Sequence, residues 1–230
     1  MAADERKRAA AEASVKFVKD GMVLGLGTGT TARHVLEVLA RRVRDEGLRI
    51  SGVPTSLATA EAAKLLGIPL TSLEEHPVLD LAIDGADEVD PRLDLIKGLG
   101  GALFREKIVA AAAKKFIVVV DDSKLVRRLG TKVPVPVEVH PFGWRATQAR
   151  LESLGATVAL RQAEAMPFRT DNGNHILDAR FGPIRSPARL AASLDAIPGA
   201  VGHGLFLGMA DLVLVASGKG VRTLRPTRTT

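Results

Sequence analysis

The stretch Val23-Leu-Gly-Leu-Gly-Thr-Gly-Thr-Thr31 joins a short apolar strand to a helix through a glycine-rich turn. The pattern predicts a strand over Val23–Leu26 and a helix from Thr30 to Arg44, with Val35 and Leu39 on its apolar stripe. A strand that passes through a tight turn into an amphipathic helix is typical of proteins that alternate strands and helices. The alternation should therefore continue along the chain.

The rest of the first half repeats this alternation. Strands are expected at 50–53, 78–83 and 116–120, and helices at 4–19, 56–66 and 102–115. The strands are almost continuously apolar, as in strands buried on both faces. The sequence therefore predicts an α/β fold, a parallel sheet with helices on both faces.

The pattern changes near residue 131. From 133 to 207 the expected order is strand, helix, strand, strand, helix, strand, which is the ferredoxin-like α+β arrangement. Residues 210–216 again have the pattern of a buried parallel strand and most simply rejoin the first sheet. We therefore expect one domain over 1–131 and 208–230, with a small inserted α+β domain over 132–207.

Composition excludes several classes of protein. The 230 residues include no cysteine, so a disulfide framework, a thiolate zinc site and a cysteine nucleophile are excluded. No apolar run approaches the length of a membrane span. The charged, alanine-rich N-terminus lacks the apolar core of a signal peptide. We expect a cytoplasmic protein with no membrane partner.

The net charge of +6 raises the question of nucleic-acid binding. Lys219, Arg222, Arg225 and Arg228 carry four of those six charges, and no acid follows Asp211. Aromatic residues make up 3% of the chain and tyrosine is absent, which leaves little for base stacking. The pattern favours a solvated basic tail and no nucleic-acid partner.

The glycine turn itself indicates an anion site. Glycines let the backbone approach a ligand, and the amides at a helix N-terminus attract negative charge. The spacing is not Gly-x-Gly-x-x-Gly, and the lysine of a nucleoside-triphosphate loop is absent. A phosphate on a small molecule is therefore the better hypothesis, and a purely structural glycine turn with a threonine cap is the alternative.

Acidic residues follow the strand at 78–83. Asp84, Asp87, Glu88 and Asp90 come directly after it, where open α/β sheets bind their ligands. The spacing does not fit a calcium loop, and the five histidines form no zinc-binding pair, so no metal is expected. A polar turn whose aspartate caps a helix remains the alternative, and Glu88 and Asp90 are best interpreted as such a solvated turn.

A third motif is Lys97-Gly-Leu-Gly-Gly-Ala-Leu-Phe-Arg-Glu-Lys107. A lysine precedes a glycine loop, and Glu106 falls near the start of the next helix. A carboxylate there could simply complement the helix dipole. Lys124 follows the strand at 116–120 and so lies at the same edge of the sheet. Together these groups suit proton transfer on a sugar phosphate, in which one group removes a proton beside a carbonyl and cations stabilise the enediolate.

The three motifs resemble those of ribose-5-phosphate isomerase, type A. The similarity extends to Thr170-Asp-Asn-Gly-Asn174 and Ala196-Ile-Pro-Gly199 and covers about residues 4–221. It implies a Rossmann-like domain with a small insertion, and interconversion of D-ribose 5-phosphate and D-ribulose 5-phosphate in the non-oxidative pentose phosphate pathway. It also implies a sugar phosphate as small-molecule partner, no cofactor, and a homodimer or homotetramer.

The resemblance also implies roles for individual residues. Glu106 matches the general base, Asp84 and Asp87 match carboxylates that handle the sugar hydroxyls, and Lys97 matches a cation beside the reacting oxygens. The positions expected to contact substrate are Lys7, Thr28, Gly29, Thr30, Thr31, Asp84, Gly85, Ala86, Asp87, Lys97, Gly98, Leu99, Gly100 and Lys124. Leu99 departs from the pattern, because glycine is expected there and leucine resists positive φ.

Two other functions fit parts of the pattern. One is a sugar-phosphate-sensing regulatory module, but the residues before Val23 leave no room for a helix-turn-helix. The other is a CoA-transferase-like enzyme with a glutamate nucleophile. The Asp84-Gly-Ala-Asp-Glu88 segment favours the isomerase over this second alternative.

Overall fold

The computed structural model describes residues 3–226, which form two compact units. Unit 1 takes in residues 3–86, 105–125 and 208–226, and unit 2 takes in residues 87–104 and 126–207. The chain passes from unit 1 to unit 2 after Ala86 and returns at Arg105. Arg228 of the expected basic tail lies outside the described residues.

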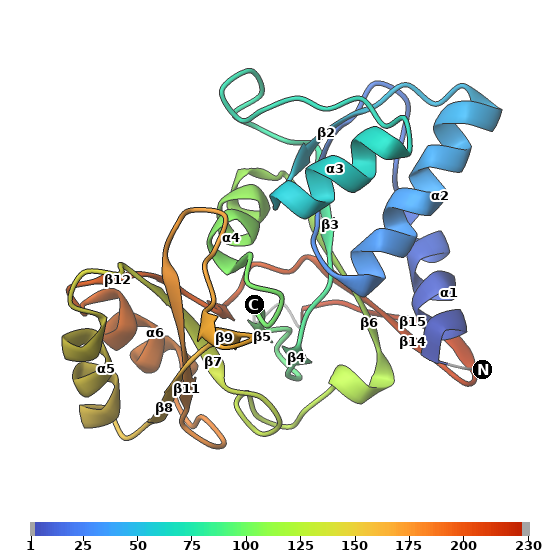
Figure 1. Ribbon diagram of the computed structural model, residues 1–230. Coiled ribbons are helices and arrows are strands. Elements are labelled where there is room, and N and C mark those ends of the chain that lie inside the picture. Colours follow the sequence, from blue (N-terminus) through green and yellow to red (C-terminus); the bar gives the residue numbers. More distant parts are fainter. Residues whose placement is uncertain (1–2, 227–230) are drawn as a thin grey trace. The chain divides into compact units, whose positions relative to one another are not determined.

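Unit 1 is built on a six-stranded sheet (Figure 1). Its strands, in spatial order, are β15 (Gly220–Leu224), β14 (Leu212–Ser217), β6 (Phe116–Asp121), β3 (Leu81–Asp84), β1 (Val23–Leu26) and β2 (Ser51–Pro54). All neighbouring strands are parallel except β15, which pairs antiparallel with β14. As predicted, the strand after the insertion returns to the first sheet.

Helices cover both faces of this sheet. They are α1 (Ala3–Val15), α2 (Thr30–Glu46), α3 (Leu57–Leu65), α4 (Leu103–Ala112) and the short 3₁₀ helix η1 (Asp122–Lys124). Side chains alternate along a strand, so Leu24 and Leu26 face the core shared with α1 and α2, which lie side by side in Figure 1. Gly25 faces the other way, where a Cβ atom would lie 2.5 Å from Val109 of α4. The α/β class is confirmed.

Several expectations about the ends of elements were wrong. The helix expected over 4–19 ends at Val15. The strand expected from Val78 begins at Leu81, and the Val78 side chain is exposed. The expected solvated tail contains the edge strand β15, although Lys219, Arg222 and Arg225 are exposed. These basic side chains are therefore exposed as expected, but Arg222 lies on a hydrogen-bonded strand and Lys219 and Arg225 lie directly beside it.

Unit 2 contains an antiparallel sheet in the order β12 (Ala200–His203), β7 (Val135–Val139), β11 (His175–Arg180), β8 (Thr157–Leu160). Helices α5 (Trp144–Ser153) and α6 (Pro187–Asp195) complete the predicted ferredoxin-like order. Val135, Val137 and Val139 point into the core that both helices share. The alternate residues, including Glu138, therefore lie on the other face of the sheet.

Smaller strands complete unit 2. β4 (Glu88–Val89), β5 (Leu95–Ile96) and β13 (Leu205–Phe206) form a three-stranded sheet, and β9 (Gln162–Ala163) pairs with β10 (Met166–Pro167). Because β5 pairs with β13, residues 87–104 belong to unit 2. The sequence placed this segment in the first domain and started the insertion at 132, whereas the second part of unit 2 starts at Val126.

Within residues 3–226, no helix combines the length and apolar character needed to cross a membrane.

Candidate active site

Asp84 is the last residue of β3, and the β3 alternation decides where it points. Leu81 and Ile83 face the core with α1 and α2, so Ala82 and Asp84 face the side covered by α4. Asp84 is 4% exposed. Its Oδ1 accepts hydrogen bonds from the amides of Thr28 at 3.1 Å and Gly85 at 2.7 Å. The carboxylate therefore joins the end of β3 to the glycine loop after β1.

Gly27 makes this close approach feasible. A Cβ atom at this position would lie 2.2 Å from Asp84 Oδ1, well inside contact distance. The Gly27 amide also donates to the carbonyl of Ile83 at 3.0 Å. The glycine is therefore required by the packing of two neighbouring strand ends, not only by the turn.

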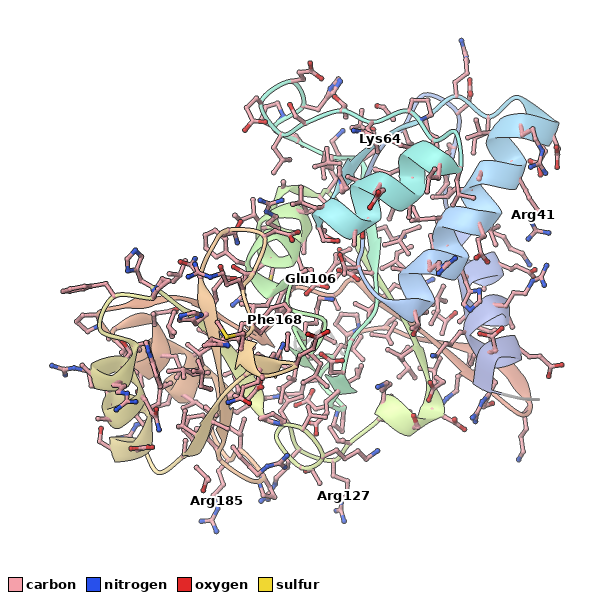
Figure 2. All side chains as sticks on the ribbon, viewed as in Figure 1. Arg41, Lys64, Glu106, Arg127, Phe168 and Arg185 are labelled. Carbon is pink, nitrogen blue, oxygen red and sulfur yellow. The ribbon has the colours of Figure 1, made fainter. Side chains whose placement is uncertain are left out.

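Glu106 meets Asp84 in a narrow crevice of unit 1. It lies in the first turn of α4 (Figure 2) and is 5% exposed. Glu106 and Asp84 line the same crevice, together with Gly25, Gly27 and Val109. Two buried carboxylates thus share one small space at the carboxyl ends of β1 and β3.

The glycine loop leaves the first amides of α2 open to an anion. The N-cap is Gly29, with φ 103°, and no side chain caps the helix. The expected alternative, a threonine cap, is therefore wrong. Uncapped amides at a helix N-terminus form an anion-binding site, and the exposed Thr30 hydroxyl lies beside them.

The Thr28 hydroxyl serves a different purpose from the one its motif suggests. It lies 2.7 Å from Thr55 Oγ1, 2.8 Å from Ser56 Oγ and 3.0 Å from Thr59 Oγ1. Ser56 caps α3 by accepting from the Thr59 amide. This hydroxyl cluster connects the glycine loop to α3. The sequence predicted only one part of it, the helix cap at residue 55 or 56.

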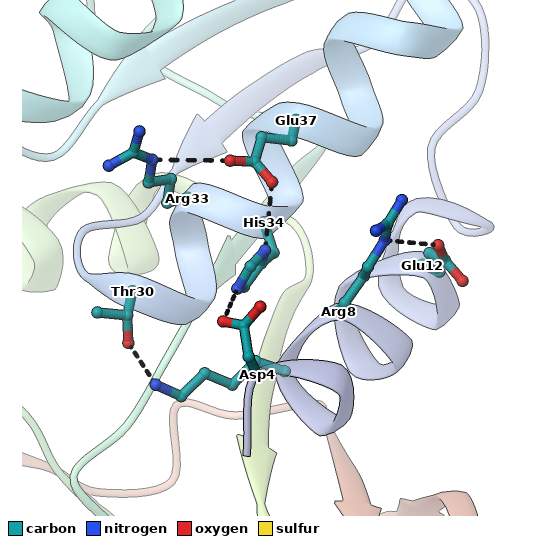
Figure 3. Close-up of polar contacts among 8 residues, drawn as sticks. Asp4, Arg8, Glu12, Thr30, Arg33, His34 and Glu37 are labelled. Carbon is teal, nitrogen blue, oxygen red and sulfur yellow. Dashed lines mark hydrogen bonds and ion pairs between the residues drawn. The ribbon is translucent and has the colours of Figure 1, made fainter. Parts of the chain in front are cut away.

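Lys7 and Lys124 add positive charge to unit 1. Lys7 Nζ donates to Thr30 Oγ1 at 2.9 Å, and His34 bridges Asp4 and Glu37 nearby (Figure 3). α1 thus brings a cation to the first turn of α2.

Lys124 follows β6, whose carboxyl end lies next to that of β3 in the sheet. Burial of the neighbouring Asp121 would by itself raise the pKa of that carboxyl. The hydrogen bonds from Ser123 and the charges of Lys124 and Arg6 outweigh burial, and the pKa of Asp121 is lowered. The end of β6 therefore keeps an ionised carboxylate beside Lys124.

In unit 2, Asp87 and the loop after Lys97 hold each other. Asp87 Oδ2 accepts from the Leu99 amide at 3.0 Å, and the Asp87 amide donates to the Ile96 carbonyl at 2.8 Å. Gly98 has φ 101°, whereas Leu99 is not among the non-glycine residues with positive φ. The backbone of Leu99 therefore needs no positive φ, so leucine is compatible with the conformation of the loop.

Lys97 is 2% exposed, which is rare for a lysine. Its amide donates to the Gly204 carbonyl at 2.9 Å, and its ammonium lies 5.6 Å from the centre of the Phe206 ring. A Cβ atom on Gly204 would lie 2.2 Å from the Lys97 carbonyl. The backbone of Lys97 is therefore fixed by close packing against Gly204.

The interpretation of Glu88 and Asp90 as a solvated turn was wrong. Glu88 has no exposed surface, and its carboxylate accepts from the amides of Gly130, Lys132 and Val133. Asp90 is 7% exposed, and this burial raises the pKa of its carboxyl. Nothing in the sequence pattern separates these acids from Asp84 and Asp87, because the partners of Glu88 lie more than 40 residues away.

The residues that the structure describes contain no group of three or more histidine or acidic side chains that could hold a metal ion. Asp84 and Glu88 instead accept backbone amides, and Glu106 lines the crevice. The chemistry that this donor set can perform is acid–base chemistry on a bound anion.

Comparisons with known proteins agree with these features. Residues 51–220 match the family described as ribose 5-phosphate isomerase A (phosphoriboisomerase A). The protein named ribose-5-phosphate isomerase A from Synechococcus sp. is 55% identical over 225 residues, covering 97% of this chain and 98% of its own. The chain belongs to the ribose-5-phosphate isomerase A family.

Further relatives span the same length. The ribose-5-phosphate isomerase A of Gloeobacter violaceus is 56% identical and covers 98% of both chains. A D-ribose-5-phosphate isomerase solved in complex with phospho-erythronic acid has a TM-score of 0.95 and 42% identity, covering 98% of this chain and 100% of its own. The enzyme from Methanocaldococcus jannaschii has a TM-score of 0.92 and 44% identity, with 96% and 98% covered. The ribose-5-phosphate isomerase A fold therefore extends over nearly the whole chain.

Proposed function

We propose that the chain interconverts D-ribose 5-phosphate and D-ribulose 5-phosphate, the aldose–ketose isomerisation of the non-oxidative pentose phosphate pathway. Family membership over nearly the full length supports this activity. Neither the regulatory module nor the CoA-transferase-like enzyme is favoured. The observation that carries the proposal is the pair of buried carboxylates, Asp84 and Glu106, lining one crevice beside the uncapped N-terminus of α2.

Glu106 is proposed as the general base. It would remove the proton from C2 of the open-chain aldose, and the electron pair would move to the carbonyl oxygen on C1, giving an enediolate. Transfer of the O2 proton to O1, together with return of the abstracted proton to C1, then gives the ketose. Proton and electron balance is complete within the substrate and the carboxyl groups, so no other reactant is needed.

The proposed roles of Asp84 and Asp87 concern the sugar oxygens. Asp84 is fixed by the Thr28 and Gly85 amides, and Asp87 by the amide of Leu99. Carboxylates held in this way can accept from sugar hydroxyls and move protons between O1 and O2. A fixed cation such as Lys97 would stabilise the negative charge that develops on those oxygens.

The phosphate is proposed to bind at the start of α2. Gly29, Thr30 and Thr31 supply amides and hydroxyls there, and Lys7 is held at Thr30. Lys124 follows β6, which is separated from β1 in the sheet by β3. Thr28 contributes its amide to Asp84 and its hydroxyl to the α3 cluster, so its proposed role is to shape the loop. The remaining proposed contacts are Gly85, Ala86, Gly98, Leu99 and Gly100.

Assembly and location stay predictions. The resemblance implies a homodimer or homotetramer, and the sequence predicts a cytoplasmic protein. Sedimentation equilibrium of the purified chain measures the oligomeric state directly. A monomer at micromolar concentration would contradict it.

The proposed activity is tested by assaying the purified chain with D-ribose 5-phosphate in the presence of a chelator. The expected result is formation of ribulose 5-phosphate, detected by NMR. Incubation with an acyl-CoA provides the contrast, and no thioester to Glu106 should be detected by mass spectrometry. Failure to convert any phosphopentose would refute the isomerase, and a thioester would favour the transferase.

A further inference from the structure

Arg161, in unit 2, binds two consecutive carbonyl groups of the loop after Lys97. Its Nη1 donates to Gly98 O at 2.9 Å and to Leu99 O at 3.0 Å. Its Nε and Nη2 donate to the two carboxylate oxygens of Asp178 on β11, at 2.9 and 2.5 Å. One planar guanidinium therefore joins the sheet of unit 2 to two peptide groups through four hydrogen bonds, and a lysine has donors for only three of them.

These contacts determine where the amides of the loop point. In a trans peptide the carbonyl and the amide project to opposite sides, and no peptide among residues 3–226 is cis. Because Arg161 binds Gly98 O, the amide of Leu99 points away from Arg161, and it reaches Asp87 Oδ2 at 3.0 Å. By the same rule, binding of Leu99 O turns the exposed Gly100 amide away from Arg161.

Arg161 is itself held firmly. The side chains of Arg161 and Asp178 are only 13% and 21% exposed. The ring of Phe168, which is labelled in Figure 2, lies 6.0 Å from the guanidinium. The backbone amide of Phe168 donates to the carbonyl of Arg161 at 2.9 Å. A Cβ atom on Gly101 would lie 2.4 Å from the Phe168 ring. The loop is thus packed against Phe168 and hydrogen-bonded to Arg161.

We propose that Arg161 is a positioning residue for the isomerisation. Through Gly98 and Leu99 it orients the amides beside Asp87 and Lys97 that meet the reacting end of the sugar. The proposal rests on the proposed function, because the direction of these amides matters to a rate only if the loop contacts substrate. Arg161 was missed in the sequence, since its partners lie 17 and more than 60 residues away.

A positioning role and a purely structural role predict different kinetics. The groups proposed to bind the phosphate, Lys7, Thr30 and Lys124, have no hydrogen bond with Arg161 in the described chain. Loss of the Arg161 hydrogen bonds to the loop should therefore lower kcat. It should leave KM and the inhibition constant of inorganic phosphate almost unchanged. A structural role would instead lower the melting temperature and the fraction of active enzyme.

The test compares Arg161→Lys with Arg180→Lys in the full chain. Arg180 is exposed on β11, two residues from Asp178, and its side chain makes no hydrogen bond or ion pair within residues 3–226. Arg161→Lys should lower kcat about 10- to 100-fold with KM within about threefold, because small misplacements of reacting groups cost rates of this order. Amide hydrogen exchange over 98–101 should quicken in Arg161→Lys and stay unchanged in Arg180→Lys.

Arg161→Lys with the kcat and loop exchange of Arg180→Lys would overturn the proposal. Arg161→Lys would also overturn the proposal if its amide hydrogen exchange were faster throughout unit 2 while its kcat per active site stayed unchanged. If the unaltered chain fails to isomerise ribose 5-phosphate, the proposed function fails instead. In that case amide hydrogen exchange alone tests whether Arg161 orients the loop. Unchanged exchange at 98–101 in Arg161→Lys shows that it does not.

Discussion

Glu106 is the residue on which the proposed chemistry depends most. It is buried in the first turn of α4 and shares a crevice with Asp84. Glu106→Gln keeps the shape of the side chain and removes the basic carboxylate. We expect kcat to fall about 10²- to 10⁴-fold, the usual range for a general acid–base group.

The matched control is Glu61→Gln, since Glu61 is exposed on α3 and has no polar partner within residues 3–226. Both variants should give the circular dichroism spectrum of the unaltered chain. A folded Glu106→Gln enzyme with near-normal kcat would show that another group takes the proton.

Glu88 illustrates an acid whose role is stability. Its carboxylate accepts three backbone amides, from Gly130, Lys132 and Val133, with no exposure to water. Glu88→Gln replaces one acceptor oxygen by an NH₂ group that faces those amides. We expect the free energy of unfolding to fall by about 2–3 kcal/mol, the cost of a buried donor left without its acceptor. Urea unfolding measures this, and an unchanged midpoint would contradict it.

At the scale of elements, the turn after β1 can lie against the end of β3 because residue 27 is glycine. In Gly27→Ala the new Cβ atom would lie 2.2 Å from Asp84 Oδ1, so either the strand end or the carboxylate must move. We expect a loss of about 1–3 kcal/mol in stability, as for other overpacked positions. We also expect kcat/KM to fall at least about tenfold, because Asp84 is displaced.

Gly218→Ala is the control for this change. A Cβ atom on Gly218 would have no heavy atom within 4 Å, and the residue has no positive φ, so alanine is accommodated there. Thermal unfolding of the two variants measures the loss of stability, and steady-state kinetics measures the loss of kcat/KM. Equal behaviour of Gly27→Ala and Gly218→Ala would refute the close approach of Gly27 to Asp84.

Asp80 links β1 to the end of α4 and makes stability depend on pH. The hydrogen bond from Lys114, at 2.8 Å, and then that from the Val23 amide, at 3.0 Å, lower the pKa of Asp80 below 3.8. The ionised carboxylate therefore stabilises the fold above pH 3.8, and this contribution is lost as the pH falls through the lowered pKa.

Asp80→Asn should accordingly reduce the free energy of unfolding at pH 7 by about 0.5–1 kcal/mol, a value limited by the solvent exposure of both partners. The difference from the unaltered chain should shrink as the pH falls below about 3.8. Urea titrations over this range measure it. A difference that does not change with pH would exclude the charge as its cause.

At the scale of the whole molecule, local patterns predicted most of the fold. The apolar strands and the helix stripe with Val35 and Leu39 indicated the parallel sheet, because burial on both faces demands such strands. Ser56 and Gly67 marked the two ends of α3, where a side-chain cap and a positive φ are needed. These features depend on neighbours within a few residues.

The remaining features depend on distant parts of the chain. The short strands β4, β5 and β13 have too few residues to show a pattern, and they form only because Leu95 and Ile96 meet Leu205 and Phe206. The partners of Glu88 and Arg161 are also distant in the sequence and come close to them only in the folded chain. For the candidate site, motifs named the acids and lysines, but only the structure separates Asp84 in the crevice from Glu88 among backbone amides.

The most direct test of the account is isomerisation of D-ribose 5-phosphate in deuterated water with chelator present, followed by NMR over many catalytic cycles. Proton transfer through an enediolate predicts that deuterium enters C1 of ribulose 5-phosphate and C2 of ribose 5-phosphate, and that Glu106→Gln slows the exchange in step with turnover. Turnover or exchange that Glu106→Gln does not slow would contradict the account.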